Sequence, residues 1–183
     1  DANERDLKKH FIPYMEQEFQ EQLSHRSTLP KAEALQALGH GGVAFEEDQC
    51  VIRIDFLTAH FTVYQPDASG SAEFCEDLPD AAESVFVMEY LHDFLREMPV
   101  DFRIIRDTEG FGKFASWEHV QGIEDLDAVT VFHQPAAVYA DGALNAKHRF
   151  DSEGTYIGIV TAQHPVDQKN YHAVFYFQVG GPD

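Results

Sequence analysis

The amino-acid sequence predicts a mainly β protein, an antiparallel sandwich of two sheets with a helical extension at its N-terminal end. Three observations predict it. After residue 43, apolar and polar residues alternate in about seven short stretches, as in half-buried strands. Turn-forming residues separate these stretches, and no helical pattern alternates with them, so a parallel α/β sheet is not expected. Before residue 40, the apolar residues follow a helical period instead.

The segment 1–40 is expected to be a helical extension of a sandwich domain at 41–183. Pro13 is expected to begin the regular helix, because proline suits the first helical turn. Apolar side chains recur there at every fourth residue and form one stripe, which comprises Leu7, Phe11, Met15, Phe19 and Leu23. The stripe either packs on its own domain or binds a partner.

The alternating stretches define the expected strands. The last two should pair as a hairpin, and Asp141-Gly142 should form a turn. A long loop near 107–127 is too irregular for a strand. The expected strands are Cys50–Tyr64 (one long strand or a hairpin), Ser84–Leu91, Met98–Arg106, Ala128–Phe132, Ala136–Tyr139 (a short edge strand), Ala146–Phe150, Thr155–Ala162 and His172–Val179.

Charge limits the classes of partner. The chain has 13 Lys and Arg residues against 32 Asp and Glu residues, which gives a formal net charge of −19 at pH 7. Nucleic acids and anionic membrane surfaces attract basic proteins, so the charge argues against both. No apolar run approaches the roughly 20 residues that a membrane span needs. The charge favours a basic protein partner, alone or within a larger complex, or cations.

Cys50 and Cys75 are the only cysteines. If bonded, they close a loop of about 25 residues, which stabilises a fold by roughly 3 kcal/mol in the chain-entropy model. Two buried free thiols are the alternative, because cysteine packs well in cores. The even number favours the disulfide. Together with a first residue, Asp1, that suggests a removed leader, it predicts an extracytoplasmic location, periplasmic or secreted.

The stretch RFDSEGTYIGIV at residues 149–160 carries a resemblance at the level of the fold. With Asp151 and Gly154 at a turn and Tyr156 just after it, the stretch resembles the E–F corner of immunoglobulin-like and cupredoxin-like sandwiches. The resemblance implies that the Tyr156 ring packs in the core while its hydroxyl bonds a backbone group upstream. It covers residues 128–180 and implies a fold that hosts many unrelated functions.

A blue-copper centre on this corner would need a cysteine shortly after the tyrosine, followed by a histidine and a methionine. No cysteine follows Cys75, and no methionine follows Met98. A type 1 copper site on the last hairpin is therefore excluded.

Ten histidines make another kind of metal site the main alternative. His164 and His172 flank the last loop, with Asp167 between them. If the strands pair, two imidazoles and a carboxylate would suit Cu, Ni or Zn, and His133 and His148 are candidates to join them. In the competing interpretation these are solvated loop or edge histidines, and no cofactor is expected.

The loop near 107–127 holds three aromatic residues, Phe111, Phe114 and Trp117. Long ordered loops often carry function, and exposed aromatic side chains serve as anchors for partners. Alternatively, these side chains cover one end of the sandwich. The GFG triplet at 110–112 lacks the third glycine and the context of a dinucleotide-binding motif.

No local catalytic motif is present, because the sequence lacks G-x-S-x-G, a P-loop and H-E-x-x-H. The acidic clusters do not follow the calcium-loop pattern, and a solvated acidic surface explains them. A hydrolase that works through Asp125 and Asp127 is the weakest hypothesis.

The sequence therefore predicts a non-catalytic, extracytoplasmic binding or accessory module. It would contact a protein partner through the helical extension (Phe11, Met15 and Phe19) and through the aromatic loop. The alternative is a periplasmic metal-binding or metal-delivery protein that uses the histidines at the strand ends.

Overall fold

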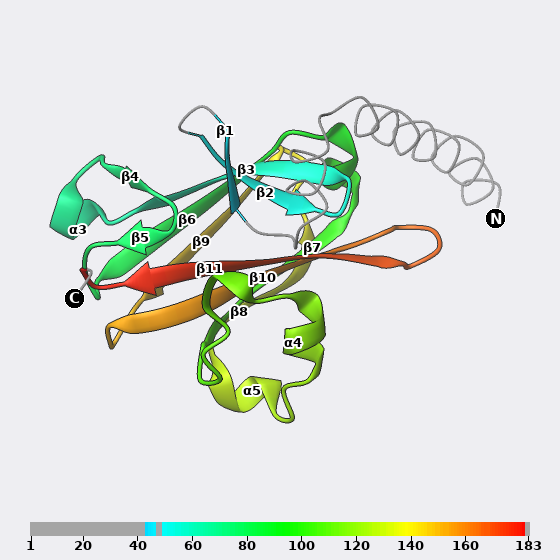
Figure 1. The fold of residues 1–183 in the computed structure, drawn as a ribbon. Coiled ribbons are helices and arrows are strands. Elements are labelled where there is room, and N and C mark those ends of the chain that lie inside the picture. Colours follow the sequence, from blue (N-terminus) through cyan, green and yellow to red (C-terminus); the bar gives the residue numbers. More distant parts are fainter. Residues whose placement is uncertain (1–42, 47–48, 182–183) are drawn as a thin grey trace.

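The computed structural model describes residues 43–46 and 49–181, which form two sheets (Figure 1). The first, sheet A, consists of β1 (Val43–Glu46), β2 (Gln49–Ile54), β3 (Leu57–Tyr64), β4 (Glu73–Phe74), β6 (Glu83–Tyr90) and β9 (Ala143–Arg149). The second, sheet B, consists of β5 (Asp77–Leu78), β7 (Pro99–Arg106), β8 (Thr130–Val138), β10 (Gly154–Gln163) and β11 (Asn170–Val179).

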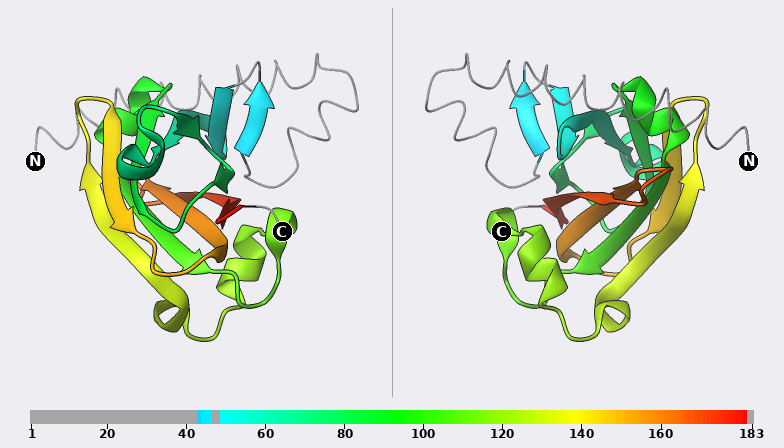
Figure 2. Two further views of the ribbon diagram at one scale, coloured as in Figure 1. Left: turned by 90° about the vertical axis from the view of Figure 1, so that its left-hand side faces the viewer. Right: turned by 90° about the vertical axis from the view of Figure 1, so that its right-hand side faces the viewer.

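The strand order is β1-β2-β3-β6-β9 in sheet A, with β4 paired to β3, and β5-β11-β10-β7-β8 in sheet B. Every pairing is antiparallel except the short one between β5 and β11. The two sheets face one another (Figure 2), so the described residues are mainly β and sandwich-like, as predicted. The expected helical extension, with Phe11, Met15 and Phe19, lies outside the described residues.

The stretch Cys50–Tyr64, predicted as one long strand or a hairpin, is the hairpin β2–β3, which turns at Asp55 with a φ of 59°. Another strand prediction was wrong in its boundaries. The two stretches predicted near 128–132 and 136–139 form one strand, β8. Pro135 is tolerated because β8 is an edge strand, where a missing backbone N–H costs no ladder bond. The residues just before β8 form the short helix α5 (Leu126–Val129).

An aromatic core fills the space between the sheets. Phe175 on β11 lies 4.8 Å from Phe61 on β3, measured between ring centroids. Gly158 on β10 faces the Phe175 ring so closely that a Cβ there would collide with it. The largest fully buried aromatic side chains are Phe61, Phe86, Phe102, Phe175 and Phe177. Because they come from both sheets, this core holds the sheets together.

The corner before β10 has the hydrogen bond that the resemblance implies. The Tyr156 hydroxyl donates to the backbone carbonyl of Ser152 at 2.7 Å. The Tyr156 ring packs edge-on against Phe150, with 4.9 Å between centroids. Gly154 has a φ of 143° at the start of the strand.

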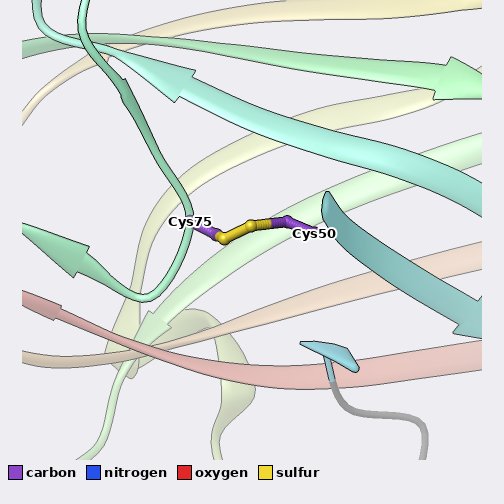
Figure 3. Close-up of a disulfide and its surroundings, with 2 residues drawn as sticks. All are labelled: Cys50 and Cys75. Carbon is purple, nitrogen blue, oxygen red and sulfur yellow. A yellow bond between two sulfur atoms is a disulfide. The ribbon is translucent and has the colours of Figure 1, made fainter. Parts of the chain in front are cut away.

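The predicted disulfide between Cys50 and Cys75 is present, with 6.1 Å between the two Cα atoms (Figure 3). It joins β2 to the residues just after β4. The chain between β3 and β6 also contains the short helix α3 (Pro66–Ser69). The disulfide therefore links the segment between β3 and β6 to strand β2 of sheet A.

Besides α5, three short helical segments follow β6: η1 (Asp93–Glu97), η2 (Gly112–Phe114) and α4 (Trp117–Gln121). Phe94 and Leu95 of η1 are buried in the main core. Among the described residues, no helix has the length and apolar character needed to cross a membrane.

Candidate functional site

The aromatic loop, residues 107–127, lies on the outer face of sheet B, away from sheet A (Figures 1 and 2). It contains η2 and α4 and runs into α5. Loop residues and outward-facing strand residues build a second, smaller core whose buried members are Ile105, Ala115, Val120, Ile157, Ile159 and Val174. The loop is therefore packed against the protein over much of its length.

One carboxylate organises the first turn of the loop. Asp107 accepts hydrogen bonds from the backbone amides of Phe111 (2.9 Å) and Gly112 (2.8 Å). Gly112 has a φ of 58°, which other residues rarely adopt. The turn leaves Phe114 78% exposed, directly before the buried Ala115. A large apolar side chain is thus held in solvent by a hydrogen-bonded turn.

Helix α4 begins with a reciprocal cap. The Ser116 hydroxyl accepts a hydrogen bond from the His119 backbone amide (3.3 Å), and His119 Nδ1 accepts one from the Ser116 backbone amide (3.2 Å). The His119 ring also stacks on Phe111, with 4.4 Å between centroids and an interplanar angle of 5°. This contact connects α4 to the turn that carries Phe114.

Trp117 attaches the loop to the sheet. Its indole lies parallel to the imidazole of His172 on β11, with 3.5 Å between centroids and an interplanar angle of 9°. His172 Nδ1 lies 3.0 Å from the hydroxyl of Thr161 on β10. Burial lowers the pKa of His172, because desolvation disfavours the imidazolium. Burial therefore favours the neutral form of the His172 ring.

The structure separates the three aromatic residues that the sequence grouped as partner anchors. Phe111 and Trp117 pack against the second core, as in the interpretation that the loop covers its own domain. Phe114 is exposed to solvent. Periodicity could not separate them, because the loop follows neither the helical nor the strand period.

The exposed surface of the loop is acidic. Lys113 is its only Lys or Arg. Burial raises the pKa of Glu76, and the nearby Lys113 partly opposes this rise. Asp127 forms an ion pair with Arg103 on β7 at 3.0 Å. Four further acidic side chains are exposed and form no ion pair within the described part of the chain: Glu109, Glu118, Glu124 and Asp125.

The last two strands pair as predicted, but His164 and His172 lie on opposite faces of sheet B. His164 follows the inward-facing residues of β10 and is only 3% exposed. Its Nδ1 accepts hydrogen bonds from the backbone amides of Val166 (3.2 Å) and Asp167 (3.3 Å). His172 faces outward against Trp117. Because side chains alternate along a strand, the two rings do not share a site.

The other two candidate ligands are also apart. His133 Nε2 lies 2.7 Å from the Asp101 carboxylate on the outer face of sheet B. His148 packs against Phe132 of β8, at the edge where β8 and β9 meet. Burial lowers the pKa of His148, and Asp151 opposes this. Between Val43 and Gly181, omitting 47–48, no three His, Cys, Asp or Glu side chains are grouped as a metal site would require.

Sequence reasoning missed four residues that shape this surface: Asp107, His119, Thr161 and Asp101. A signal existed for the first, because an aspartate before a glycine-containing stretch often bonds the following amides. His119 was hidden because the third residue of a capping box is usually Glu or Gln. The contacts of Asp101 and Thr161 depend on strand register, which the sequence left open.

Comparison with known proteins finds a similar solved structure but no matching family. No protein-family model matches the chain, and no curated protein matches it. Among solved structures, the chain is similar to the crystal structure of the soluble domain of PmoD from Methylocystis sp. ATCC 49242 (Rockwell). The identity is 29% and the TM-score 0.58, over 76% of this chain and 97% of that one. The chain therefore resembles the PmoD soluble domain in both fold and sequence.

Proposed function

We propose that this protein is a non-catalytic, extracytoplasmic accessory module that binds a protein partner through its aromatic loop, with Phe114 as the anchor. The helical extension at 1–40 would form a second part of the contact. The observation that carries the proposal is the exposure of Phe114 on a loop whose other aromatic residues are packed.

The loop meets two requirements of a binding anchor. Aromatic side chains that enter a partner's pocket often dominate interface energies. The turn around Asp107 and the cap at Ser116 already order the loop, so association has less conformational entropy to overcome. Burying a fully exposed phenylalanine contributes about 2 kcal/mol.

Charge supports a basic partner. The loop carries exposed carboxylates around Phe114, and the whole chain has a net charge of −19. Complementary charge raises association rates, and salt screens it. We expect the partner to present an apolar pocket bordered by Lys or Arg.

The compartment and the comparison agree with this proposal. A disulfide persists in oxidising compartments, which supports a periplasmic or secreted location. The likeness to the soluble domain of PmoD supports a module of the same kind, a domain of a larger protein. The metal-binding alternative stays a prediction from the sequence, because the described histidines are spread over both faces of sheet B and the sheet edge.

Site-specific photo-crosslinking in cells tests the proposal. A photoreactive benzoyl-phenylalanine at position 114 should give one discrete protein adduct. The same residue at Val138, an exposed position on β8, should not give it. Raising the salt from about 0.05 M to about 0.5 M in extracts should reduce the adduct, because screening weakens charge steering. Absence of an adduct from position 114, or the same adduct from both positions, would contradict the proposal.

A further inference from the structure

The aromatic loop is held by two histidines whose contacts depend on protonation. His119 Nδ1 accepts the hydrogen bond of the Ser116 backbone amide, and only an unprotonated nitrogen can accept it. His172 is the sheet residue on which Trp117 stacks. The stack of His119 on Phe111 connects α4 to the turn that carries Phe114, and the stack of Trp117 on His172 connects α4 to sheet B, so both contacts influence how Phe114 is presented.

Protonation removes the cap at His119 directly. A proton on Nδ1 would face the Ser116 N–H, which is itself a donor, so the reciprocal cap would lose one of its two bonds. The added positive charge would also lie in the first turn of α4, where the helix dipole disfavours cations. The stack on Phe111 then loses one of the contacts that orient the His119 ring.

Protonation of His172 also weakens its stacked position against the Trp117 indole. The imidazole is partly removed from water and has the neutral Thr161 hydroxyl as its hydrogen-bond partner. The titratable or charged residues on the two loop helices that contact β11 are Lys113 of η2 and Glu118 and His119 of α4, and Asp101 lies on β7, one strand beyond β10 in the sheet. None forms an ion pair or hydrogen bond with His172 in the described part of the chain. An indole face attracts a cation, but the burial that lowers the pKa of His172 opposes its charging.

We propose that mild acid loosens the aromatic loop through protonation of His119 and His172, so that the presentation of Phe114 is pH-controlled. This inference rests on the proposed function only for its biological consequence, which is release of the partner. A group with a lowered pKa in the folded state stabilises that state above its unfolded pKa, and the stabilisation is lost as the pH falls. For His172 the loss begins below about pH 6.5.

Trp117 is the only tryptophan in the chain, so its fluorescence reports on the loop alone. Acrylamide quenching of the full chain should be measured across the histidine range. We expect the quenching constant to rise about two-fold between about pH 7.5 and about pH 5, as the loop opens locally. Far-UV circular dichroism of the same samples should stay constant.

A double variant supplies the matched control. His119→Gln keeps an acceptor of the type that capping boxes use, and His172→Phe keeps a ring beneath Trp117, while neither residue titrates. Its quenching constant should not change over this pH range. His60→Gln, which alters a histidine on sheet A beside Glu89, should keep the response of the unmodified protein.

Three results would overturn the inference. They are a constant quenching value in the unmodified protein, an unchanged pH response in the double variant, and loss of the sheet signal over the same range. The measurement needs no partner. A failed crosslink at position 114 and a failed pH response therefore reject different claims.

Discussion

Two buried tyrosines show how single hydroxyl groups affect stability. The Tyr156 hydroxyl donates a short hydrogen bond to the Ser152 carbonyl. Tyr90 is only 7% exposed, yet its hydroxyl has no hydrogen-bond partner among the described residues. Burial raises the pKa of Tyr90, with smaller contributions from Tyr139 and Asp141. A buried polar group without a partner costs about 1–3 kcal/mol.

Removing these hydroxyls should have opposite effects. We expect Tyr90→Phe to leave the free energy of unfolding unchanged or to raise it by about 1 kcal/mol, because it deletes an unsatisfied group. Tyr156→Phe should lower it by about 1 kcal/mol, because the Ser152 carbonyl loses its donor. Urea unfolding of both variants measures the difference. Equal destabilisation by the two substitutions would show that Tyr90 has a partner.

Gly158 tests the close packing of the core. A Cβ at this position would collide with the Phe175 ring. We therefore expect Gly158→Ala to lower the free energy of unfolding by about 1–3 kcal/mol, which is the usual cost of overpacking. Gly181→Ala is the control, since nothing lies within 4 Å of the added carbon. A neutral result at position 158 would mean that the Phe175 ring moves without cost.

At the scale of elements, the alternation of apolar and polar residues predicted where most strands lie. It did not predict which side chains meet between strands. The stretches ending at Arg106 and Val179 coincide with the ends of β7 and β11. The same alternation separates His164 from His172, because the turn between the strands sets them on opposite faces. Whether two residues on paired strands lie on the same face depends on strand register and turn length, which the sequence left undetermined. The capping of α5 by Asp125, which bonds the Ala128 amide at 3.2 Å, was likewise hidden within an acidic run.

The turn of the aromatic loop offers a prediction at this scale. Asp107→Asn replaces one acceptor oxygen with an amide group that cannot accept a hydrogen bond. We expect the amides of Phe111 and Gly112 to exchange their hydrogens about ten-fold faster, which corresponds to roughly 1.4 kcal/mol of local stability. Glu109→Gln changes an exposed neighbour and should leave these rates unaltered. Equal rates in both variants would contradict the role of Asp107.

At the scale of the whole molecule, composition and period predicted a mainly β, two-sheet fold and the pairing of the cysteines. The outer core beneath the aromatic loop was not predicted. Its members come from four separated segments, such as Ile105, Val120, Ile157 and Val174, and each alone reads as an ordinary strand or loop residue. Only the assembled sheet shows that this loop has a surface to cover.

The disulfide should contribute to global stability. It links residues 25 positions apart, so the chain-entropy model gives roughly 3 kcal/mol. We expect the double variant Cys50→Ser/Cys75→Ser to lose about this much free energy of unfolding. The unmodified protein under a strong reductant should shift by a similar amount. If neither the double variant nor the reductant shifted the unfolding midpoint, the disulfide would constrain the unfolded chain very little.

Native mass spectrometry tests the central claim, that the protein binds a partner through Phe114. The full chain would be purified without chelator from an oxidising compartment, beside a Phe114→Ser variant. We expect a protein complex for the unmodified chain and the bare monomer for the variant, with the chain two hydrogens light from the disulfide in both samples. A monomer that carries one Cu, Ni or Zn ion in both samples, with no bound protein, would contradict it and favour the metal-binding alternative.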